Sequence, residues 1–323
     1  MTPGEDDPAS GVAAHIPGAR LPHAAPRPDE GGKVAKLREA VGQVRPASRV
    51  LAFADSDGRP GPQWLRELVR PLAQPEAEVG ATTGYRWHMP RPDPGTRTWL
   101  PSLLRAVWNS FITSLLGHPR SNFCWGGSMA LRRETFERLR MEERWRGSVS
   151  DDYTLSTALR GASLKIRFVP ACLVPNYGDC GWRELLSWTT RQIIITRVYA
   201  PGLWKLGLAA HGLYCLATAA LAASLPALPS TLLLAGIAAT GAATGAARTA
   251  QPERRREIRS FGWAFVLLAP LIPFLMLYNF VLAGLTRTIT WRGTSYRLDG
   301  PRRTVVLWRE SARPSPAPAT NPE

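Results

Sequence analysis

Apolar positions in the first 200 residues fall into short runs that alternate with segments of helical spacing. The runs predict strands at 50–54, 79–85, 122–131 and 165–169, and the helical spacing predicts helices at 63–72, 96–116 and 151–160. Strands that alternate with helices predict an α/β domain with a largely parallel, Rossmann-like sheet. In such a sheet, ligands bind beyond the carboxyl ends of the strands.

Beyond residue 200 the pattern changes to three long uncharged runs, at 206–225, 228–247 and 261–285. About twenty helical residues cross a hydrocarbon core of roughly 30 Å, so the runs predict three transmembrane helices. Three buried helices of a soluble protein are the alternative. Pro270 and Pro273 are expected to kink or break the third span.

The net charge and the arginines that flank the apolar runs favour a membrane location. The formal net charge of +15 suits anionic lipid, a phosphorylated substrate or nucleic acid, but no nucleic-acid motif accompanies it, so we expect no nucleic-acid partner. Arginines at 248, 254–256 and 259 follow the second run, which predicts that this loop and the N-terminal domain are cytosolic. Both flanks of the third run are basic, so the charges do not decide on which side of the membrane the C-terminal tail lies.

The cysteines indicate neither a metal centre nor a disulfide framework. Their spacing contains no CxxC pair, and a reducing cytosolic setting fits them. They are Cys124, Cys172, Cys180 and Cys215.

Two carboxylates follow the first predicted strand directly. Asp55 and Asp57 flank one small residue in the sequence Asp-Ser-Asp-Gly. Carboxylates at this spacing hold a hard divalent cation, which in turn grips a diphosphate. The alternative is a turn rich in Asp, because Asp favours turns through side-chain to backbone hydrogen bonds.

A second acidic pair, Asp151 and Asp152, opens a predicted helix after Ser150. Helix capping explains this pattern well, since Ser is a good N-cap and acidic residues in the first turn suit the helix dipole. A catalytic role would need one of the two, preferably Asp152, to face a cleft as general base for an acceptor hydroxyl.

The segment 182–199 predicts a helix at the membrane surface. Trp188, Arg191, Gln192 and Ile195 share one helical face, and further apolar residues cover the rest. This mixture directly before an apolar span suits the interface plane of a bilayer. An ordinary amphipathic surface helix is the alternative.

In their order along the chain, these motifs resemble the membrane-bound, lipid-directed members of glycosyltransferase family 2, and most of all the ceramide glucosyltransferase branch. The resemblance spans roughly residues 30 to 300. Its motifs are FADSD at 53–57, NFCWGGSM at 122–129 followed by two arginines, SDDY at 150–153, WTTRQ at 188–192 followed by TR at 196–197, and ITWRGTSYR at 289–297.

The resemblance implies a GT-A fold followed by a C-terminal transmembrane helix bundle. It further implies inverting transfer from a nucleotide-sugar donor of the UDP-glucose type to a ceramide-like lipid hydroxyl at the cytosolic membrane face. Asp55 and Asp57 would bind Mg²⁺ or Mn²⁺, and Lys33 and Asp151 would help to hold the donor. Asp152 would be the base. The acceptor and interface residues would be Gly126, Gly127, Ser128, Trp188, Arg191, Gln192 and Arg197, although the family's Q/RxxRW signature is not literally present.

This interpretation divides the chain into six parts. They are an irregular remnant at 1–30, the GT-A-like domain at 31–181, the interface helix at 182–204, three transmembrane helices at 205–286, a basic juxtamembrane segment at 287–310 and a disordered tail at 311–323. The family's opening strand and anchor helix are expected to be missing, which would reduce activity. An inactive membrane remnant and a non-enzymatic membrane-surface protein are the competing interpretations of this integral membrane protein of the bacterial inner-membrane type.

Overall fold

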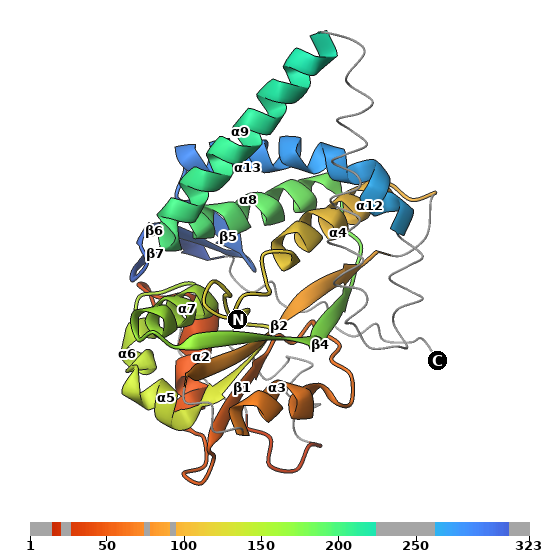
Figure 1. The fold of residues 1–323 in the computed structure, drawn as a ribbon. Coiled ribbons are helices and arrows are strands. Elements are labelled where there is room, and N and C mark those ends of the chain that lie inside the picture. Colours follow the sequence, from red (N-terminus) through yellow and green to blue (C-terminus); the bar gives the residue numbers. More distant parts are fainter. Residues whose placement is uncertain (1–14, 21–26, 74–77, 91–94, 224–261, 310–323) are drawn as a thin grey trace, which may run out of the picture.

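The computed structural model describes residues 15–20, 27–73, 78–90, 95–223 and 262–309 (Figure 1). In chain order, the elements before the apolar helices are α2 (Gly32–Gly42), β1 (Val50–Ala54), α3 (Trp64–Ala73), β2 (Val79–Met89), α4 (Trp99–Thr113), β3 (Ser128–Arg132), α5 (Arg133–Arg138), α6 (Met141–Trp145), α7 (Asp151–Gly161), β4 (Lys165–Tyr177) and α8 (Trp182–Tyr199). They are followed by α9 (Pro201–Ala223), α12 (Gly262–Leu268), the 3₁₀ turn η2 (Ala269–Leu271), α13 (Ile272–Leu285), β5 (Thr288–Trp291), β6 (Thr294–Gly300) and β7 (Arg303–Arg309).

The central sheet is mixed. Its strand order is β1-β3-β2-β4, and β3 runs antiparallel to both β1 and β2, whereas β2 and β4 are parallel. The prediction of an α/β domain is therefore confirmed, and the prediction of a mostly parallel sheet is wrong for the described strands. A short buried strand is equally apolar whether it runs parallel or antiparallel to its neighbours. The apolar pattern therefore predicts that a strand is buried but not its direction.

Helices cover both faces of this sheet. On one face, Leu51 and Phe53 pack with residues of α2, α5, α6 and α7, and the Phe53 ring meets the edge of Trp145 at 5.7 Å between centroids. On the other face, Leu68 and Leu72 of α3 pack against Ala130 and neighbouring sheet residues. The alternation of inward and outward side chains in β1 is what the period of a strand requires.

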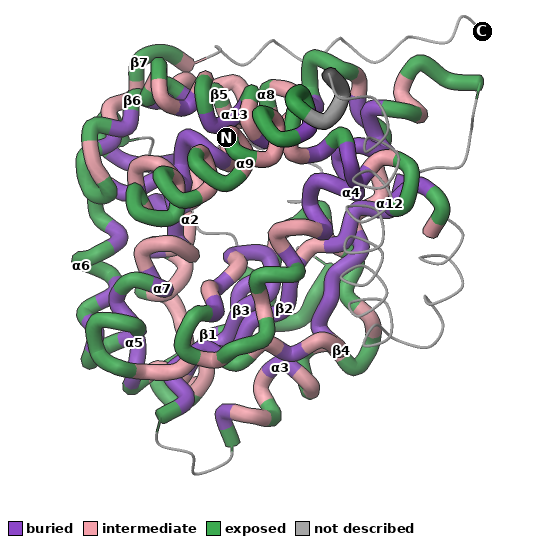
Figure 2. The backbone as a smooth tube through the Cα atoms, turned by 45° about the horizontal axis from the view of Figure 1, so that its top comes forward, coloured by how far each residue is buried: buried purple, intermediate pink, exposed green. Residues whose placement is uncertain are grey.

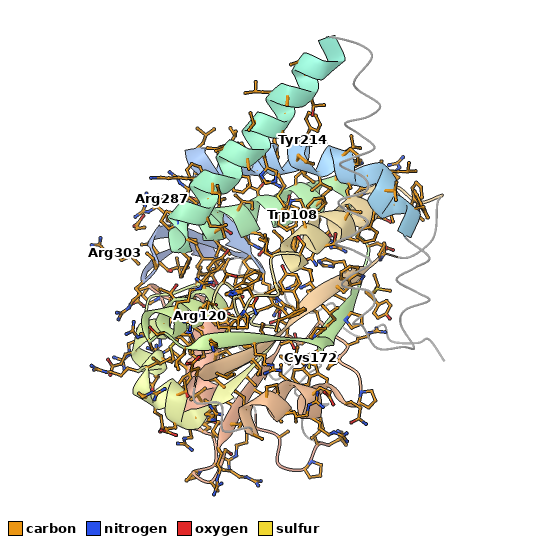
Figure 3. All side chains as sticks on the ribbon, in the orientation of Figure 1. Trp108, Arg120, Cys172, Tyr214, Arg287 and Arg303 are labelled. Atoms are coloured by element: carbon orange, nitrogen blue, oxygen red, sulfur yellow. The ribbon has the colours of Figure 1, made fainter. Side chains whose placement is uncertain are left out.

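Strands β2 and β4 continue past the rest of the sheet towards the later helices (Figure 1). Both are longer than predicted. Their extensions join a second core, in which Trp87 of β2 stacks on Phe265 of α12 at 5.9 Å. Figure 2 shows buried backbone running along β2 and α4, and Trp108 of α4, labelled in Figure 3, is 1 % exposed. The central sheet and the apolar helices therefore share a core.

One helical stretch in the described residues is long and apolar enough to cross a membrane. It is Gly262–Leu285, with a mean hydropathy of 2.2, and the η2 turn that contains Pro270 divides it as predicted. Helix α9 occupies the first predicted span and projects from the other helices (Figure 1), and the predicted span at 228–247 lies outside the described residues. The structure thus supports membrane association through one candidate span, and the predicted bundle of three is not confirmed.

A three-stranded sheet, β5-β6-β7, occupies the segment predicted only as basic and juxtamembrane. Figure 3 places Arg287 and Arg303 at its outer side. The sheet holds the start of the domain, because Val306 N donates to Pro28 O at 2.8 Å and Gly32 N donates to the Tyr296 hydroxyl at 3.3 Å. The C-terminal strands therefore fix the N-terminus of α2.

The buried ion pair of Arg38 and Glu30 gives a test of this fold. Arg38 Nη1 lies 2.9 Å from Glu30, and the two residues are 8 % and 2 % exposed. Arg38→Ala removes the closer partner, which contacts both oxygens of the buried Glu30, and leaves it with Arg27 at 3.7 Å, so we expect the unfolding free energy to fall by about 3 kcal/mol. Arg140→Ala, which breaks the exposed pair with Glu143, should cost about 1 kcal/mol or less. Thermal unfolding followed by circular dichroism measures both, and equal losses would contradict this account.

Candidate active site

Lys33 lies between two carboxylates that come from distant parts of the chain. Its Nζ is 2.9 Å from Asp55 Oδ1 and 3.3 Å from Asp151 Oδ1. Asp55 directly follows β1, Lys33 lies in the first turn of α2, and Asp151 is the first residue of α7. One ammonium group therefore joins the ends of three elements in the region where sequence analysis placed the site.

Backbone contacts hold these three ends together. Gly31 N donates to Ser148 O at 3.0 Å, and a Cβ at Gly31 would lie 2.8 Å from Val149 Cα. A side chain at this position would push α2 away from α7, so glycine allows the two helix starts to meet. Asp55 N in turn donates to Gly127 O at 3.4 Å.

Asp152 is held by backbone donors from two sides. Gly126 N donates to Asp152 Oδ2 at 3.2 Å, while Tyr153 N and the Ser150 hydroxyl donate to Oδ1, the former at 2.8 Å. Ser150 Oγ also accepts from Tyr153 N, so the predicted helix cap is confirmed. The turn that Ser150 caps also directs Asp152 towards Gly126. Helix capping and a role in a site are therefore compatible for this acidic pair.

Asp151 is 2 % exposed, and its Oδ2 has no hydrogen-bond partner among the described residues. Burial raises its pKa to about 6, and the nearby carboxylates of Asp152 and Asp55 add to this rise, although the Lys33 ammonium opposes it. Burial alone would lower the pKa of Lys33, but Asp151 and Asp55 outweigh it and hold that pKa above its ordinary value. Lys33 therefore stays charged.

The loop 126–128 has no room for larger side chains beside the acids. A Cβ at Gly126 would lie 2.3 Å from Asp151 Oδ2, and one at Gly127 would lie 2.7 Å from Asp55 Oδ2. The two glycines therefore let the loop border the cluster, and the acceptor role expected of this loop stays a prediction. Ser128 is fully buried, and its hydroxyl accepts from Trp64 Nε1 and donates to Cys172 O, so it ties the sheet to α3.

Arg86 of β2 is a site residue that the sequence analysis missed. Its Nη2 lies 3.5 Å from Asp55 Oδ2, and its guanidinium covers the rings of Trp125 and Trp188 at 5.2 and 5.8 Å. A guanidinium stacked between aromatic faces is well placed to bind an anion. A charged residue directly after an apolar strand was the signal that could have identified it.

The predicted residues of α8 fall in different surroundings. Arg191 covers the Trp291 ring at 5.4 Å, and burial together with the charge of Arg86 lowers its pKa to about 10, so the two guanidinium groups lie near each other. Arg197 instead donates to Ala283 O at 2.6 Å, at the end of α13. Gln192 is partly buried. Trp188 and Arg191 thus border the site, whereas Arg197 ties α8 to the candidate span.

The end of α8 also fixes the start of α7. The Tyr199 hydroxyl accepts from Val149 N at 2.9 Å and from Ser150 N at 3.3 Å. The Tyr153 hydroxyl is 2.7 Å from Thr196 Oγ1, which adds a second link. Helix α8 therefore positions the acidic pair through two hydroxyl groups that the sequence analysis did not single out.

Asp57 is exposed, and the carboxylate of Asp55 already contacts two cations. The described residues contain no group of three His, Cys, Asp or Glu side chains that could hold a metal ion by itself. Two carboxylates together with donor phosphates are nevertheless the usual ligands of Mg²⁺. Asp57 forms no ion pair among the described residues, so the two carboxylates would hold a divalent cation only together with such phosphates.

Comparison with known proteins identifies the class. The family described as glycosyl transferase family 21 matches residues 26–303, so the chain belongs to this family of glycosyltransferases. No curated protein matches the sequence. A solved structure titled "Crystal Structure of a Mycobacterial Protein" matches with 20 % identity over 55 % of each chain at a TM-score of 0.33, so this chain spans about half of that one.

The pKa of Asp151 predicts how stability changes with pH. The unfolded carboxyl ionises near its ordinary value of 3.8 and the folded one at about 6, so the folded state binds more protons between these values. Stability should therefore fall as pH rises through this window, by an amount on the order of 2–3 kcal/mol, and Asp151→Asn should remove this contribution. Urea unfolding of both proteins from pH 4 to pH 7 measures the difference.

Asp57→Asn, at an exposed carboxylate of the same region, is the control. It should leave the dependence of the unfolding free energy on pH unchanged. The unfolding free energy of the wild type minus that of Asp151→Asn should fall with pH. A difference that is constant or that rises with pH would contradict the burial of an ionisable Asp151.

Proposed function

We propose that this glycosyltransferase moves a hexose from a UDP-sugar of the UDP-glucose type to the hydroxyl of a ceramide-like lipid, with inversion at the anomeric carbon. The observation that carries the proposal is the convergence of Asp55, Asp151 and Asp152 around Lys33, with Arg86 beside them. Membership of a glycosyltransferase family supports the sugar donor and the acceptor.

On the donor side, the cations of the cluster bind the diphosphate. Lys33 and Arg86 form ion pairs with Asp55, and their N–H donors also suit phosphate oxygens. Asp55 and Asp57 would hold Mg²⁺ or Mn²⁺, which supplies positive charge to the phosphate that leaves. Arg191, near Arg86 and partly desolvated, adds charge on the same side.

On the acceptor side, Asp152 is the general base. Hydrogen bonds from Gly126 N and Tyr153 N orient its two oxygens, and the remaining lone pairs can accept the proton of a hydroxyl. The deprotonated oxygen attacks the anomeric carbon from the side opposite the phosphate, the bond to UDP breaks, and the proton stays on Asp152. Attack from the opposite side inverts the configuration.

A membrane location brings the acceptor to this site. The candidate span Gly262–Leu285 packs on α8, whose residues Trp188 and Arg191 border the cluster. The net charge of +15 favours the anionic cytosolic leaflet. A lipid hydroxyl at headgroup depth therefore has a short route to Asp152.

Binding of the donor tests the metal and phosphate site. Full-length protein in detergent should bind UDP-glucose in a Mn²⁺-dependent manner, measured by isothermal titration calorimetry. Asp57→Asn removes one carboxylate of the proposed ligand pair, so we expect affinity to fall by at least about tenfold. Asp299→Asn, at an exposed carboxylate on β6, should have no effect. Donor binding that is independent of Mn²⁺ and of Asp57 would favour the interpretation as a non-enzymatic membrane-surface protein or an inactive remnant.

Turnover tests the base separately. Asp152→Asn preserves the shape of the side chain, and its single oxygen can accept from either Gly126 N or Tyr153 N, but it cannot take the proton, so kcat should fall by about 10²–10⁴-fold while donor affinity stays unchanged. Release of UDP in the presence of ceramide measures kcat. Glu142→Gln, an exposed acid on α6, serves as control. Undiminished turnover in Asp152→Asn would assign the base to another residue.

A further inference from the structure

The outer side of the helical stretch Gly262–Leu285 is apolar along its whole length. The stretch contains no charged residue, and its large exposed side chains recur every three or four residues, which is the spacing of one helical face. These side chains, each 43–65 % exposed, form what we call the outer face and include Trp263, Leu267, Leu271, Phe274, Tyr278 and Val281. A continuous exposed apolar stripe of this kind marks contact with another molecule or with lipid.

The opposite side of the stretch packs on α8, and the two helices run side by side (Figure 1). Asn279 Oδ1 accepts from the Thr190 hydroxyl at 2.9 Å, and Ala283 O accepts from Arg197 at 2.6 Å. Because α8 also borders the acidic cluster, the stretch lies alongside the domain that holds the site.

Both ends of the stretch are bound to that same domain. At the start, Phe265 stacks on Trp87 of β2 at 5.9 Å between ring centroids. After Leu285 the chain enters β5 and β6, where the Tyr296 hydroxyl accepts from Gly32 N of α2 at 3.3 Å. Both ends therefore lie on the side of the central sheet and its helices.

This packing conflicts with a helix that crosses the bilayer. The stretch has 24 residues and is about 36 Å long at about 1.5 Å per residue, so a crossing helix would have its ends on opposite sides. The sheet domain, which is bound at both ends, would then have to lie in the hydrocarbon beside it. Helix α8 carries the exposed charged residues Arg183 and Glu184, and charges are costly at that depth.

Helix α9 continues the apolar surface away from the domain (Figure 1). It crosses α13 at Gly207, where a Cβ would lie 2.3 Å from the Phe280 ring, so glycine allows the two helices to touch. Beyond the crossing, Leu213 and Leu216 are 70 % and 71 % exposed. A second copy of this chain that covered the outer face would have to avoid this projecting helix, whereas lipid can surround it.

Basic and aromatic residues mark the level at which the apolar surface begins. Trp204 and the exposed Lys205 precede the part of α9 without Asp, Glu, Lys or Arg, at 206–223. Arg287, which Figure 3 labels, and Arg292 of the turn between β5 and β6 are exposed beyond the end of α13. Tryptophan and basic residues are typical of the boundary between head groups and hydrocarbon, and the positive charges attract anionic lipids. Charge thus favours a lipid surface over a protein partner.

We propose that Gly262–Leu285 lies in the plane of the membrane surface instead of crossing it, with the outer face inserted into one leaflet that carries anionic head groups. Both ends then stay on the side of the acidic cluster, and α8 lies between the leaflet and the site. The inference goes beyond the proposed function, because it concerns how the chain contacts the bilayer and holds whether or not sugar is transferred.

Thiol labelling tests on which side of the membrane each end lies. Gly262→Cys and Arg287→Cys are made in a Cys215→Ser background, because the other cysteines are buried, and a Cβ at Gly262 meets no neighbouring group within 4 Å. Sealed membrane vesicles of either orientation are treated with a membrane-impermeant maleimide, and labelled peptides are identified by mass spectrometry. We expect both thiols to react in the same vesicle orientation as Arg138→Cys, an exposed position of α5. Labelling of the two ends from opposite sides would overturn the proposal.

Depth measurements test the orientation of the helix, and they stay decisive where an end lies too deep to react. The full chain, in nanodiscs that contain phosphatidylglycerol, carries one nitroxide at Leu267, Phe274 or Val281, and its accessibility to oxygen and to a water-soluble nickel complex gives its depth. The first and last positions are about 21 Å apart along the axis, so in a crossing helix Phe274 would lie about 10 Å deeper than either. A helix in the membrane plane instead gives three similar depths, about 5–10 Å below the head groups.

A nitroxide at Leu65, an exposed apolar position of α3, is the control and should be accessible to the nickel complex. A maximum of depth at Phe274 would overturn the proposal. Free access of the nickel complex to all three positions of the outer face, or their shielding from both reagents by a second copy of the protein, would overturn it as well.

Discussion

The salt bridge of Lys33 to Asp55 and Asp151 is the interaction on which the rest of the site depends. It joins the end of β1 to the starts of α2 and α7, at 2.9 and 3.3 Å, and it compensates a carboxylate that is almost fully buried. Two acids this close would repel each other without the ammonium between them. The same ammonium would contact the diphosphate of the proposed donor.

The rest of the fold keeps these ends in place from several directions. Antiparallel β3 brings the loop 126–128 back to the end of β1, where the glycines allow close approach to Asp55 and Asp151. The C-terminal sheet holds the start of α2 through Tyr296, and α8 holds the start of α7 through Tyr199. Because α8 also packs on α13, it links the acidic cluster to the candidate membrane span.

Sequence pattern predicted the local elements well and their spatial arrangement less well. The helix Trp182–Tyr199 and the cap at Ser150 follow from short-range spacing. The family motifs grouped Lys33, Asp55 and Asp151, and the structure brings their side chains together, although the ion pairs themselves were not predicted. Strand direction in the sheet, the strands β5–β7 and the role of Arg86 depend on contacts between distant segments, which apolar periodicity does not encode.

The central claim is that this cluster couples release of UDP to glycosylation of a lipid. The most direct measurement is the stoichiometry of both products, with the full chain in lipid nanodiscs supplied with Mn²⁺, UDP-glucose and ceramide. The account predicts one glycolipid, detected by mass spectrometry, for each UDP released. Release of UDP without glycolipid, or the absence of both products despite Mn²⁺-dependent binding of the donor, would contradict it.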